Sequence, residues 1–427
     1  MPAWKFSIHL ASGETWFQVT LILIQALAAL AMMLGWKTRI AQAIALVLLC
    51  SLQSRNNVIL SAADDLLRLS LFWSLFLPLN RAFAVEQDTQ STSRQSSSLG
   101  SVAFITQLFL MYFVTGLLKH HPIWLEEGSA LYYALHIDMY MKPAGVFLRD
   151  YLGLTQTLTW LTLVLEIFGP FLIFAGARLR TIAIILFIGF HFGLVLTMTL
   201  GLFPWIAIIY WLALIPDSWW LTTAGLKLNQ ILDIFFSSAR TVVANLHPTK
   251  SQSHSYVFTR TGQVFLMICF GLMIWTNLAS LSKKVPFPKT VQATTYYLYL
   301  NQHWNMFAPY PIKNDGWFVI EGIFKDGSVK ELQTNREVTF DKPALPSTYY
   351  ANSEWRKWML NVWDRGNRRI LLPYARYLCR KFSASETNNS DVSTIKISFM
   401  KETTPPMGES FTPVEQRVLW EHDCFAQ

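Results

Sequence analysis

The chain has 427 residues, of which 52% are hydrophobic and only 15% are charged. Because soluble domains carry about 25% charged residues, this composition is typical of a membrane protein in a lipid bilayer. The formal net charge is +8, but lysine and arginine are scattered through loops and form no single basic stretch. The charge pattern therefore does not indicate a nucleic-acid-binding protein.

Hydropathy predicts about eight membrane segments, because each crossing of the hydrocarbon core needs about 20 apolar residues. In chain order they are residues 16–35, 40–54, 62–79, 101–118, 154–176, 179–200, 202–216 and 262–281. Several of these segments are short or interrupted by polar residues. The sequence thus predicts a polytopic α-helical membrane protein with approximate segment ends.

Positive charges between the segments predict their orientation, because short cytoplasmic loops are rich in lysine and arginine. Positive residues follow the first, third, fifth and seventh segments, for example at Lys37, Arg81, Arg178 and Lys227. These four connections all fall on one side, which we take as cytoplasmic. We therefore expect the N-terminus, Lys119 and everything after Leu281 on the outer side of a bacterial inner membrane.

Two of the expected cytoplasmic connections have a distinct composition. Residues 86–100 are polar and rich in serine and glutamine, which indicates a loop. Residues 219–245 alternate apolar and polar positions at helical spacing, which predicts an amphipathic helix on the membrane surface.

The composition becomes that of a soluble domain after Lys284. An Asp-Gly pair at 326–327 between residues 317–325 and 328–333 predicts a β-hairpin. Residues 355–379 have helical character, and residues 395–400 alternate as in a short strand. The chain is thus predicted to comprise a transmembrane helical domain, 1–281, and a small extracytoplasmic α+β domain, 282–427.

The four cysteines and the absence of several catalytic motifs limit the kinds of functional site that the sequence predicts. Cys50 and Cys269 lie inside predicted membrane segments and are expected to pack there. Cys379 and Cys424 both belong to the exported domain, where an oxidising compartment would allow them to pair. The sequence contains no metal-binding spacing, phosphate-binding glycine loop or serine-hydrolase motif, so no metal site is predicted.

Three polar residues lie at or near membrane depth, where an unpartnered polar group is costly. Lys119 closes the fourth segment and is either a lysine that snorkels to the interface or a functional amine. Glu166 lies inside the fifth segment, either paired with a cation or held as the neutral acid. His191 lies inside the sixth, as a hydrogen-bonded core histidine or a functional imidazole.

Charged residues also crowd the connection between the second and third segments. Asp64 and Arg68 stand four residues apart, so a helix would place them on one face as an ion pair. Arg55 with Asp64 and Asp65 is most simply a structural cluster that holds this connection together.

A run of short motifs carries a family resemblance over almost the whole chain. They are Gly35-Trp36-Lys37-Thr38-Arg39, Ser51-Leu52-Gln53-Ser54-Arg55-Asn56-Asn57, Tyr112-Phe113-x-x-Gly116-x-x-Lys119-x-x-x-x-Trp124, Phe190-His191, Leu200-Gly201-Leu202-Phe203-Pro204-Trp205, Trp304-x-Met306-Phe307-Ala308-Pro309, Asp326-Gly327 and Tyr374-Ala375-x-x-Leu378-Cys379-Arg380. In this order they resemble the horizontally transferred transmembrane (HTTM) domain family, the bacterial relatives of the vitamin K-dependent γ-glutamyl carboxylase.

The resemblance implies a chemistry as well as a fold. In the carboxylase, a buried lysine takes a proton from vitamin K hydroquinone, and oxygen then converts the quinol to a strongly basic alkoxide. That alkoxide removes a γ-proton from a peptide glutamate, and carbon dioxide captures the carbanion. Lys119 matches that lysine, which must act as the free amine, a form that burial favours. Glu166 and His191 match acidic and histidine positions, so we assign them supporting roles. Reduced vitamin K or another lipid-soluble quinol, and an exported peptide, are the implied cofactor and substrate.

The sequence departs from the family in two places. Members usually begin with one more transmembrane helix than this chain, which agrees with an outside N-terminus. The carboxylase also has a histidine in the loop that corresponds to Arg55-Asn56-Asn57, where this chain has none. The second departure bears on the site that would hold the oxygenated cofactor.

Three interpretations of function follow. The first is an enzyme of the carboxylase kind, a carbon–carbon lyase that uses a quinol with Lys119 as general base. The second is a membrane protein without carboxylase activity that binds a lipid or quinone-like ligand. The third is a scaffold whose exported domain binds a partner.

Overall fold

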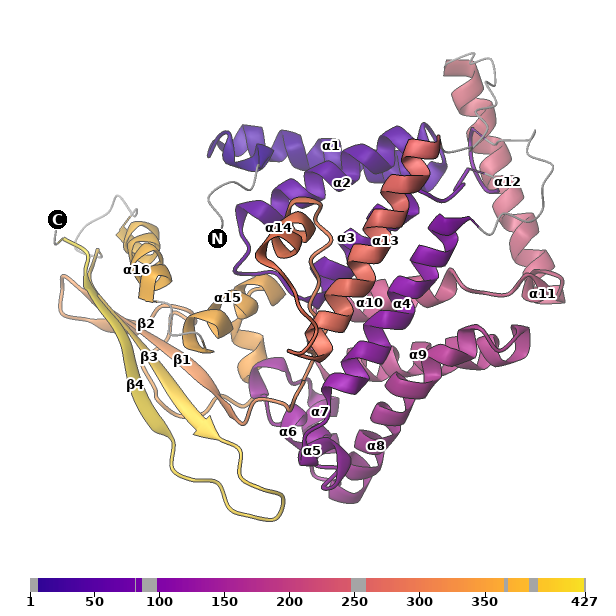
Figure 1. Cartoon of the computed structure of the whole chain (residues 1–427). Helices are drawn as coiled ribbons and strands as arrows, with labels where there is room; N and C mark the ends of the chain where they lie inside the picture. Colours follow the sequence, from indigo (N-terminus) through magenta and orange to yellow (C-terminus); the bar gives the residue numbers. More distant parts are fainter. Residues whose placement is uncertain are drawn as a thin grey trace. The chain divides into compact units, whose positions relative to one another are not determined.

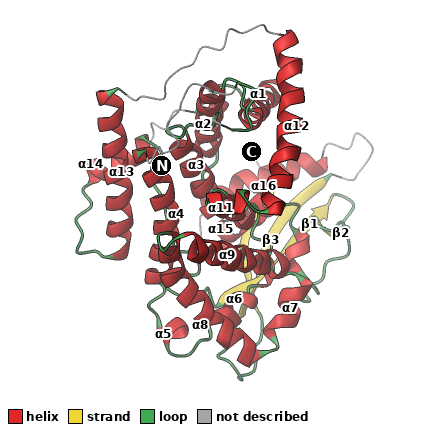
Figure 2. Cartoon of the chain, turned by 90° about the vertical axis from the view of Figure 1, so that its right-hand side faces the viewer, coloured by secondary structure: helices red, strands yellow, loops and turns green. Residues whose placement is uncertain are grey.

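The computed structural model describes residues 7–80, 82–86, 98–246, 259–364, 368–383 and 391–425. Most of the predicted loop 86–100 lies outside these ranges. Helices dominate, and the described strands form one small sheet (Figure 2). Spatial contacts divide the chain into two units, each made of three separate stretches of sequence. The first unit is 1–118, 164–189 and 205–306, and the second is 119–163, 190–204 and 307–427. The predicted boundary at 281/282 follows composition instead and stays a prediction.

The first unit is a bundle of helices. Its helices are α1 (Thr15–Leu34), α2 (Thr38–Arg55), α3 (Ala62–Ser74), α4 (Leu99–Leu118), α11 (Asp217–Trp220), α12 (Thr223–Leu246), α13 (Arg260–Leu281) and α14 (Lys289–Tyr297), with 3₁₀ turns η1 (Ile8–Leu10) and η3 (Gly169–Ile173). Helices α8 (Leu152–Phe168), α9 (Ala177–Thr197) and α10 (Phe203–Leu212) contribute residues to both units. Within the bundle α1 packs on α2, and α4 packs on α3 and α13 (Figure 1).

All eight predicted membrane segments fall on helices, but five of these are long and apolar enough to cross a membrane. They are Thr15–Leu34, Leu99–Leu118, Leu152–Ile173, Ala177–Thr197 and Arg260–Leu281. Helix α3 ends at Ser74, short of the predicted 79, and α10 has only ten residues. At about 1.5 Å per residue, neither helix alone spans a hydrocarbon core of about 30 Å. The remaining crossings stay predictions.

Residues 219–245 are largely helical, as their periodicity predicts. Helix α12 is amphipathic, and its apolar side chains Leu226, Ile231 and Ile234 are exposed. An exposed apolar face of this kind is what a helix lying on a membrane surface presents. Its location on the membrane stays a prediction.

The second unit contains a four-stranded antiparallel sheet. Its elements are α5 (Pro122–Leu125), α6 (Ala130–Leu135), η2 (Asp138–Tyr140), α7 (Pro143–Arg149), β1 (Asn314–Phe324), β2 (Val329–Glu331), η4 (Pro346–Tyr349), α15 (Ser353–Asp364), α16 (Arg368–Ser383), β3 (Val392–Thr403) and β4 (Glu415–Asp423). The strand order is β2-β1-β3-β4 (Figure 1). The predicted hairpin is confirmed: β1 pairs with β2 around Gly327, whose φ of 81° suits glycine.

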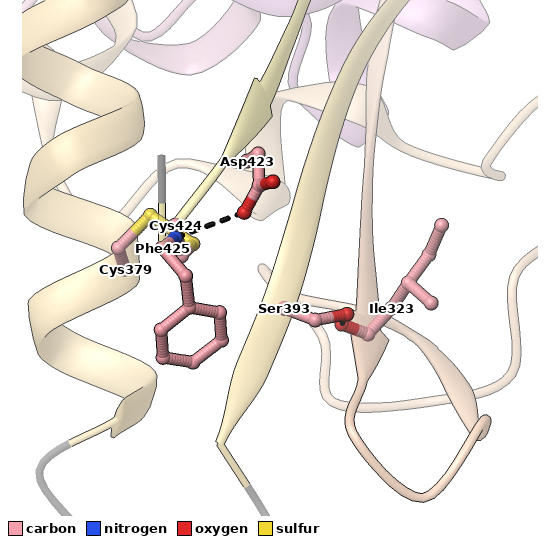
Figure 3. Close-up of a disulfide and its surroundings, with 6 residues drawn as sticks. All are labelled: Ile323, Cys379, Ser393, Asp423, Cys424 and Phe425. Atoms are coloured by element: carbon pink, nitrogen blue, oxygen red, sulfur yellow. Dashed lines mark hydrogen bonds between the residues drawn. A yellow bond between two sulfur atoms is a disulfide. The ribbon is translucent and has the colours of Figure 1, made fainter. Parts of the chain in front are cut away.

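Helix α16 packs on β3 and β4, and their facing side chains form the core of this unit. The predicted helix 355–379 falls on two helices, α15 and α16, and the predicted strand 395–400 lies inside β3. A disulfide joins Cys379 on α16 to Cys424 just after β4, with the Cα atoms 5.6 Å apart (Figure 3). Cys50 and Cys269 are buried and lie outside this disulfide, as expected of packing residues.

Candidate functional site

Lys119 follows directly after the last residue of α4 and is almost fully buried. Its side chain is 2% exposed, and its Nζ lies 4.7 Å from the centroid of the Trp124 ring. The indole is fixed in turn, because its Nε1 donates to the Phe307 carbonyl oxygen at 3.1 Å. A lysine that snorkels keeps its ammonium in water. The burial of Lys119 does not fit that interpretation.

The turn around Lys119 follows from the residues next to it. Pro122 occupies the first turn of α5, where its missing N–H costs nothing. The His121 Nδ1 accepts from the Ile123 N–H at 3.3 Å and caps the same helix. The polar pair His120-His121 thus ends one helix and starts the next, and His120 itself is exposed.

Glu166 is 5% exposed on α8, within the first unit. The backbones of α4 and α8 approach closely beside it, at Gly116. A Cβ on Gly116 would lie 2.7 Å from the Ile167 Cγ1 and 3.3 Å from the Glu166 Cβ. Small residues at such contacts are typical of helix packing in membranes.

His191 is fully buried on α9, within the second unit. Aromatic rings surround the imidazole, whose centroid lies 5.1 Å from that of Phe190 and 5.6 Å from that of Phe203. Lys119 and His191 belong to the second unit and Glu166 to the first. All three predicted site residues are buried, and their association in one site stays a prediction.

The structure also contains a buried polar centre in the first unit, which we call the Arg68 centre. Arg68 is 2% exposed and donates four hydrogen bonds. The acceptors are Tyr299 O at 2.9 Å, Gln53 Oε1 at 2.5 Å, Asp65 Oδ1 at 2.7 Å and Asn301 O at 2.6 Å. One guanidinium thereby joins α2 and α3 to the segment after α14.

A chain of amides and indoles continues from the same segment. Trp73 Nε1 donates to Gln107 Oε1 at 3.2 Å, and Gln107 Nε2 donates to Gln302 Oε1 at 2.7 Å. Trp304 Nε1 donates to the same Gln302 oxygen at 2.8 Å. All four side chains are at most 3% exposed. Buried polar side chains need such partners, because they are removed from water.

The ion pair of this region differs from the predicted one. Arg68 pairs with Asp65, three residues away, rather than with Asp64. Because α3 begins at Ala62, Asp64 lies at the third helical position and turns back to accept from the Ser61 N–H at 2.8 Å. Arg55 is exposed at the end of α2. The sequence pointed to Arg68 and Asp65 but not to the acceptors on Gln53, Tyr299 and Asn301, which no motif connects with Arg68.

A second buried acidic group lies in the sheet unit. Asp315, at the start of β1, is 4% exposed and accepts from the Met139 N–H at 3.3 Å. The adjacent Asp138 is bound by Arg149 Nη1 at 2.9 Å and by Lys342 Nζ at 2.6 Å. Burial, and next the negative charge of Asp138, raise the pKa of Asp315 to about 8. No sequence motif pointed to this carboxyl.

Among the described residues, no group of three His, Cys, Asp or Glu side chains is placed to hold a metal ion. A family model, the HTTM domain, matches residues 6–219, which is half of the chain. The chain belongs to the HTTM domain family. The match includes Lys119, Glu166 and His191, whereas the sheet of this HTTM protein lies beyond it. HTTM proteins are associated with carboxylase-like membrane proteins. No solved structure matches the chain.

Proposed function

We propose that this HTTM protein carries out quinol-dependent chemistry of the carboxylase kind, with Lys119 as general base. The observation that carries the proposal is the burial of the Lys119 amine against the Trp124 ring, 4.7 Å from Nζ to the ring centroid. An amine removed from water is favoured as the free base, and a general base must be free when it accepts a proton. The ring opposes this effect in part, because it attracts the ammonium form.

The residues around Lys119 suit a flat aromatic ligand that bears a hydroxyl. The Nζ can accept the hydroxyl proton, and the indole offers an apolar surface on which a ring can stack. Bound there, reduced vitamin K or another lipid-soluble quinol would supply, on oxidation by dissolved oxygen, the strong base that removes the glutamyl γ-proton. Lys119 would hold the proton that leaves the hydroxyl oxygen. In this proposal Glu166 and His191 orient the amine and set the charge around it.

We place the reaction at the outer face of a bacterial inner membrane, where an exported glutamyl peptide is accessible. The disulfide between Cys379 and Cys424 supports this placement, because disulfides persist in oxidising compartments and are rare in the cytosol (Figure 3). Of the bridged pair, Cys379 is buried and Cys424 is partly buried, which fits a structural bond. Labelling of the two thiols in intact cells by a membrane-impermeant maleimide, only after reduction, tests the placement.

The test of the base compares Lys119→Met with wild type in detergent micelles supplied with reduced quinone, a glutamyl peptide and 14C bicarbonate. We expect incorporation of the label to fall by about a hundredfold or more, since general-base catalysis contributes 10²–10⁴-fold. Lys142→Met is the matched control, because that lysine lies in the same unit and donates to the Val195 carbonyl oxygen at 2.6 Å.

Three outcomes separate the interpretations. Retained incorporation in Lys119→Met, with an unchanged elution profile and melting temperature, contradicts the role of the base. A wild-type protein that incorporates no label with any quinol, yet is labelled by a quinone photoprobe, is a binding protein without chemistry. A variant that fails to accumulate points to a structural lysine, and Lys119→Arg then tests whether a retained charge restores the fold without turnover.

A further inference from the structure

The first turn described in the chain, η1, carries a buried histidine. His9 is 1% exposed, and it lies against Ser51 of α2, which is 3% exposed. Both residues belong to the first unit. A polar side chain so completely removed from water needs hydrogen-bond partners for both ring nitrogens.

One ring nitrogen of His9 has its partner. Ser51 Oγ accepts from the His9 backbone N–H at 3.1 Å and lies 2.8 Å from the His9 Nδ1. Ser7 Oγ donates to the Ser51 carbonyl oxygen at 2.6 Å, which fixes the turn on the helix. Ser51 Oγ also lies 3.2 Å from Ser7 Oγ, and a hydroxyl oxygen can accept two hydrogen bonds, so the contact with Nδ1 allows a hydrogen on either ring nitrogen. In the tautomer in which Ser51 donates to Nδ1, a neutral imidazole carries its hydrogen on Nε2.

The imidazole is held neutral. Burial, and next the positive charge of Arg55, lower the pKa of His9. The ring therefore carries one hydrogen at neutral pH. In the tautomer in which Ser51 donates to Nδ1, the outer nitrogen of the ring is a hydrogen-bond donor.

That donor has no partner within the described part of the chain. The His9 Nε2 is buried and accepts or donates no hydrogen bond there, and the same holds for the Oε1 of Gln18. Gln18 belongs to the same corner, because its Nε2 donates to the carbonyl oxygens of His9 at 3.0 Å and Ser12 at 2.6 Å. A buried donor left unsatisfied is costly and calls for an explanation, such as a bound ligand.

We propose that His9 adopts the Nε2–H tautomer and that this corner binds an oxygen of a lipid-soluble molecule, with the His9 Nε2–H donating to a carbonyl group. The bilayer is the source, because η1 leads directly into α1, a candidate span whose side chains Trp16, Leu23 and Leu27 are more than half exposed. Two molecules of the bilayer carry such a carbonyl at this depth: an isoprenoid quinone and the acyl ester of a phospholipid. This site does not depend on Lys119, which lies in the other unit.

The experiment measures the infrared band of the carbonyl group of the bound molecule. The purified protein in detergent micelles receives a few equivalents of decylbenzoquinone or of a phospholipid, each labelled with 13C at the carbonyl, and infrared difference spectra are recorded. We expect the labelled band to move to lower wavenumber in wild type and not in His9→Phe. The affinity for the bound probe should fall about three- to tenfold, as expected for one lost hydrogen bond.

The controls separate this site from the fold and from the proposed base. His120→Phe removes an exposed histidine and should leave the shifted band unchanged, as should Lys119→Met. His9→Gln keeps an N–H donor and should retain part of the shift, which covers the case in which His9→Phe fails to fold. Ser51→Ala should weaken the shift, because the imidazole can then carry its hydrogen on Nδ1.

Each outcome decides the proposal. A shift with the quinone alone or with the phospholipid alone identifies the source of the carbonyl. No shift with either probe in wild type overturns the proposal and leaves a buried water as the partner of Nε2. A 15N spectrum of protein labelled at histidine reports the tautomer, because the signal of His9 is the one that His9→Gln removes. If that signal is that of an imidazole with its hydrogen on Nδ1, the proposal is also overturned.

Discussion

Truncation of Arg68 should be among the most destabilising single changes in the first unit. Arg68→Ala removes four hydrogen bonds at once, two of them to backbone carbonyl oxygens of the segment after α14. It also leaves the carboxylate of Asp65, whose side chain is only 14% exposed, without its cation. Breaking a buried ion pair by removing one partner costs about 3–5 kcal/mol. We expect a loss of unfolding free energy in that range.

The assay is reversible unfolding in mixed micelles, followed by tryptophan fluorescence. Arg55→Ala is the matched control, because Arg55 lies in the same region but is exposed. We expect its effect to stay within about 0.5 kcal/mol, as for most surface substitutions. A double-mutant cycle with Asp65→Ala isolates the pair, and its coupling should be at least about 1 kcal/mol.

Two results would refute this reasoning. If Arg68→Ala and Arg55→Ala destabilise the protein equally, burial of the guanidinium does not decide its contribution. If the coupling with Asp65 is near zero, the carboxylate finds water when its partner is removed.

Two further predictions concern the sheet unit and the helix bundle. The carboxyl of Asp315, with its pKa of about 8 in the folded protein against 3.8 ordinarily, binds a proton that the unfolded chain has lost between those pH values. The contribution of this carboxyl to the stability of the folded protein is therefore complete below about pH 4 and falls as the pH rises toward 8. Because Asp315→Asn removes this titration, the melting temperature of the variant should decline less than that of wild type from about pH 5 to 8. Parallel curves of melting temperature against pH for the two proteins would contradict this. In the bundle, Gly116→Ala places a Cβ 2.7 Å from Ile167 Cγ1 and should cost about 1–3 kcal/mol. Gly189→Ala on α9 meets nothing within 4 Å and should be neutral or stabilising by up to about 1 kcal/mol, and equal melting temperatures for the two alanine variants would rule out the close approach as the cause.

Local patterns predicted the elements of the fold well. The apolar segments fall on helices, and the Asp-Gly pair at 326–327 forms the hairpin, because both signals depend on neighbouring residues alone. The end of α3 was placed too late, since the apolar run continues past Ser74 although the helix does not. Hydropathy cannot detect such an end, because turns and helices of apolar residues have the same average.

The polar centres were harder to predict because their partners are far apart in the chain. Arg68 receives its acceptors from residues 53, 65, 299 and 301, and Gln107 is satisfied by Gln302. Spacing on one helix suggested Asp64 as the partner of Arg68, but the capping requirement of α3 had already engaged that carboxylate. A sequence signal for these centres exists only as polar residues within apolar segments, such as Gln107, and it does not identify the partner.

Arg68 and Lys119 are two buried basic side chains that are suited to different tasks by their chemistry. A guanidinium does not lose its proton in proteins and offers five donors in a fixed plane, which suits the four acceptors around Arg68. An amine can release its proton when it is buried, which suits Lys119, at 2% exposure, to proton transfer. Exchange of lysine and arginine at the two positions should therefore affect different properties, stability at Arg68 and turnover at Lys119. Arg68→Lys should lower the unfolding free energy, because one ammonium cannot reach all four acceptors, whereas Lys119→Arg should abolish turnover with a smaller loss of stability. Equal effects of the two exchanges on both stability and turnover would show that the cations do not differ in role.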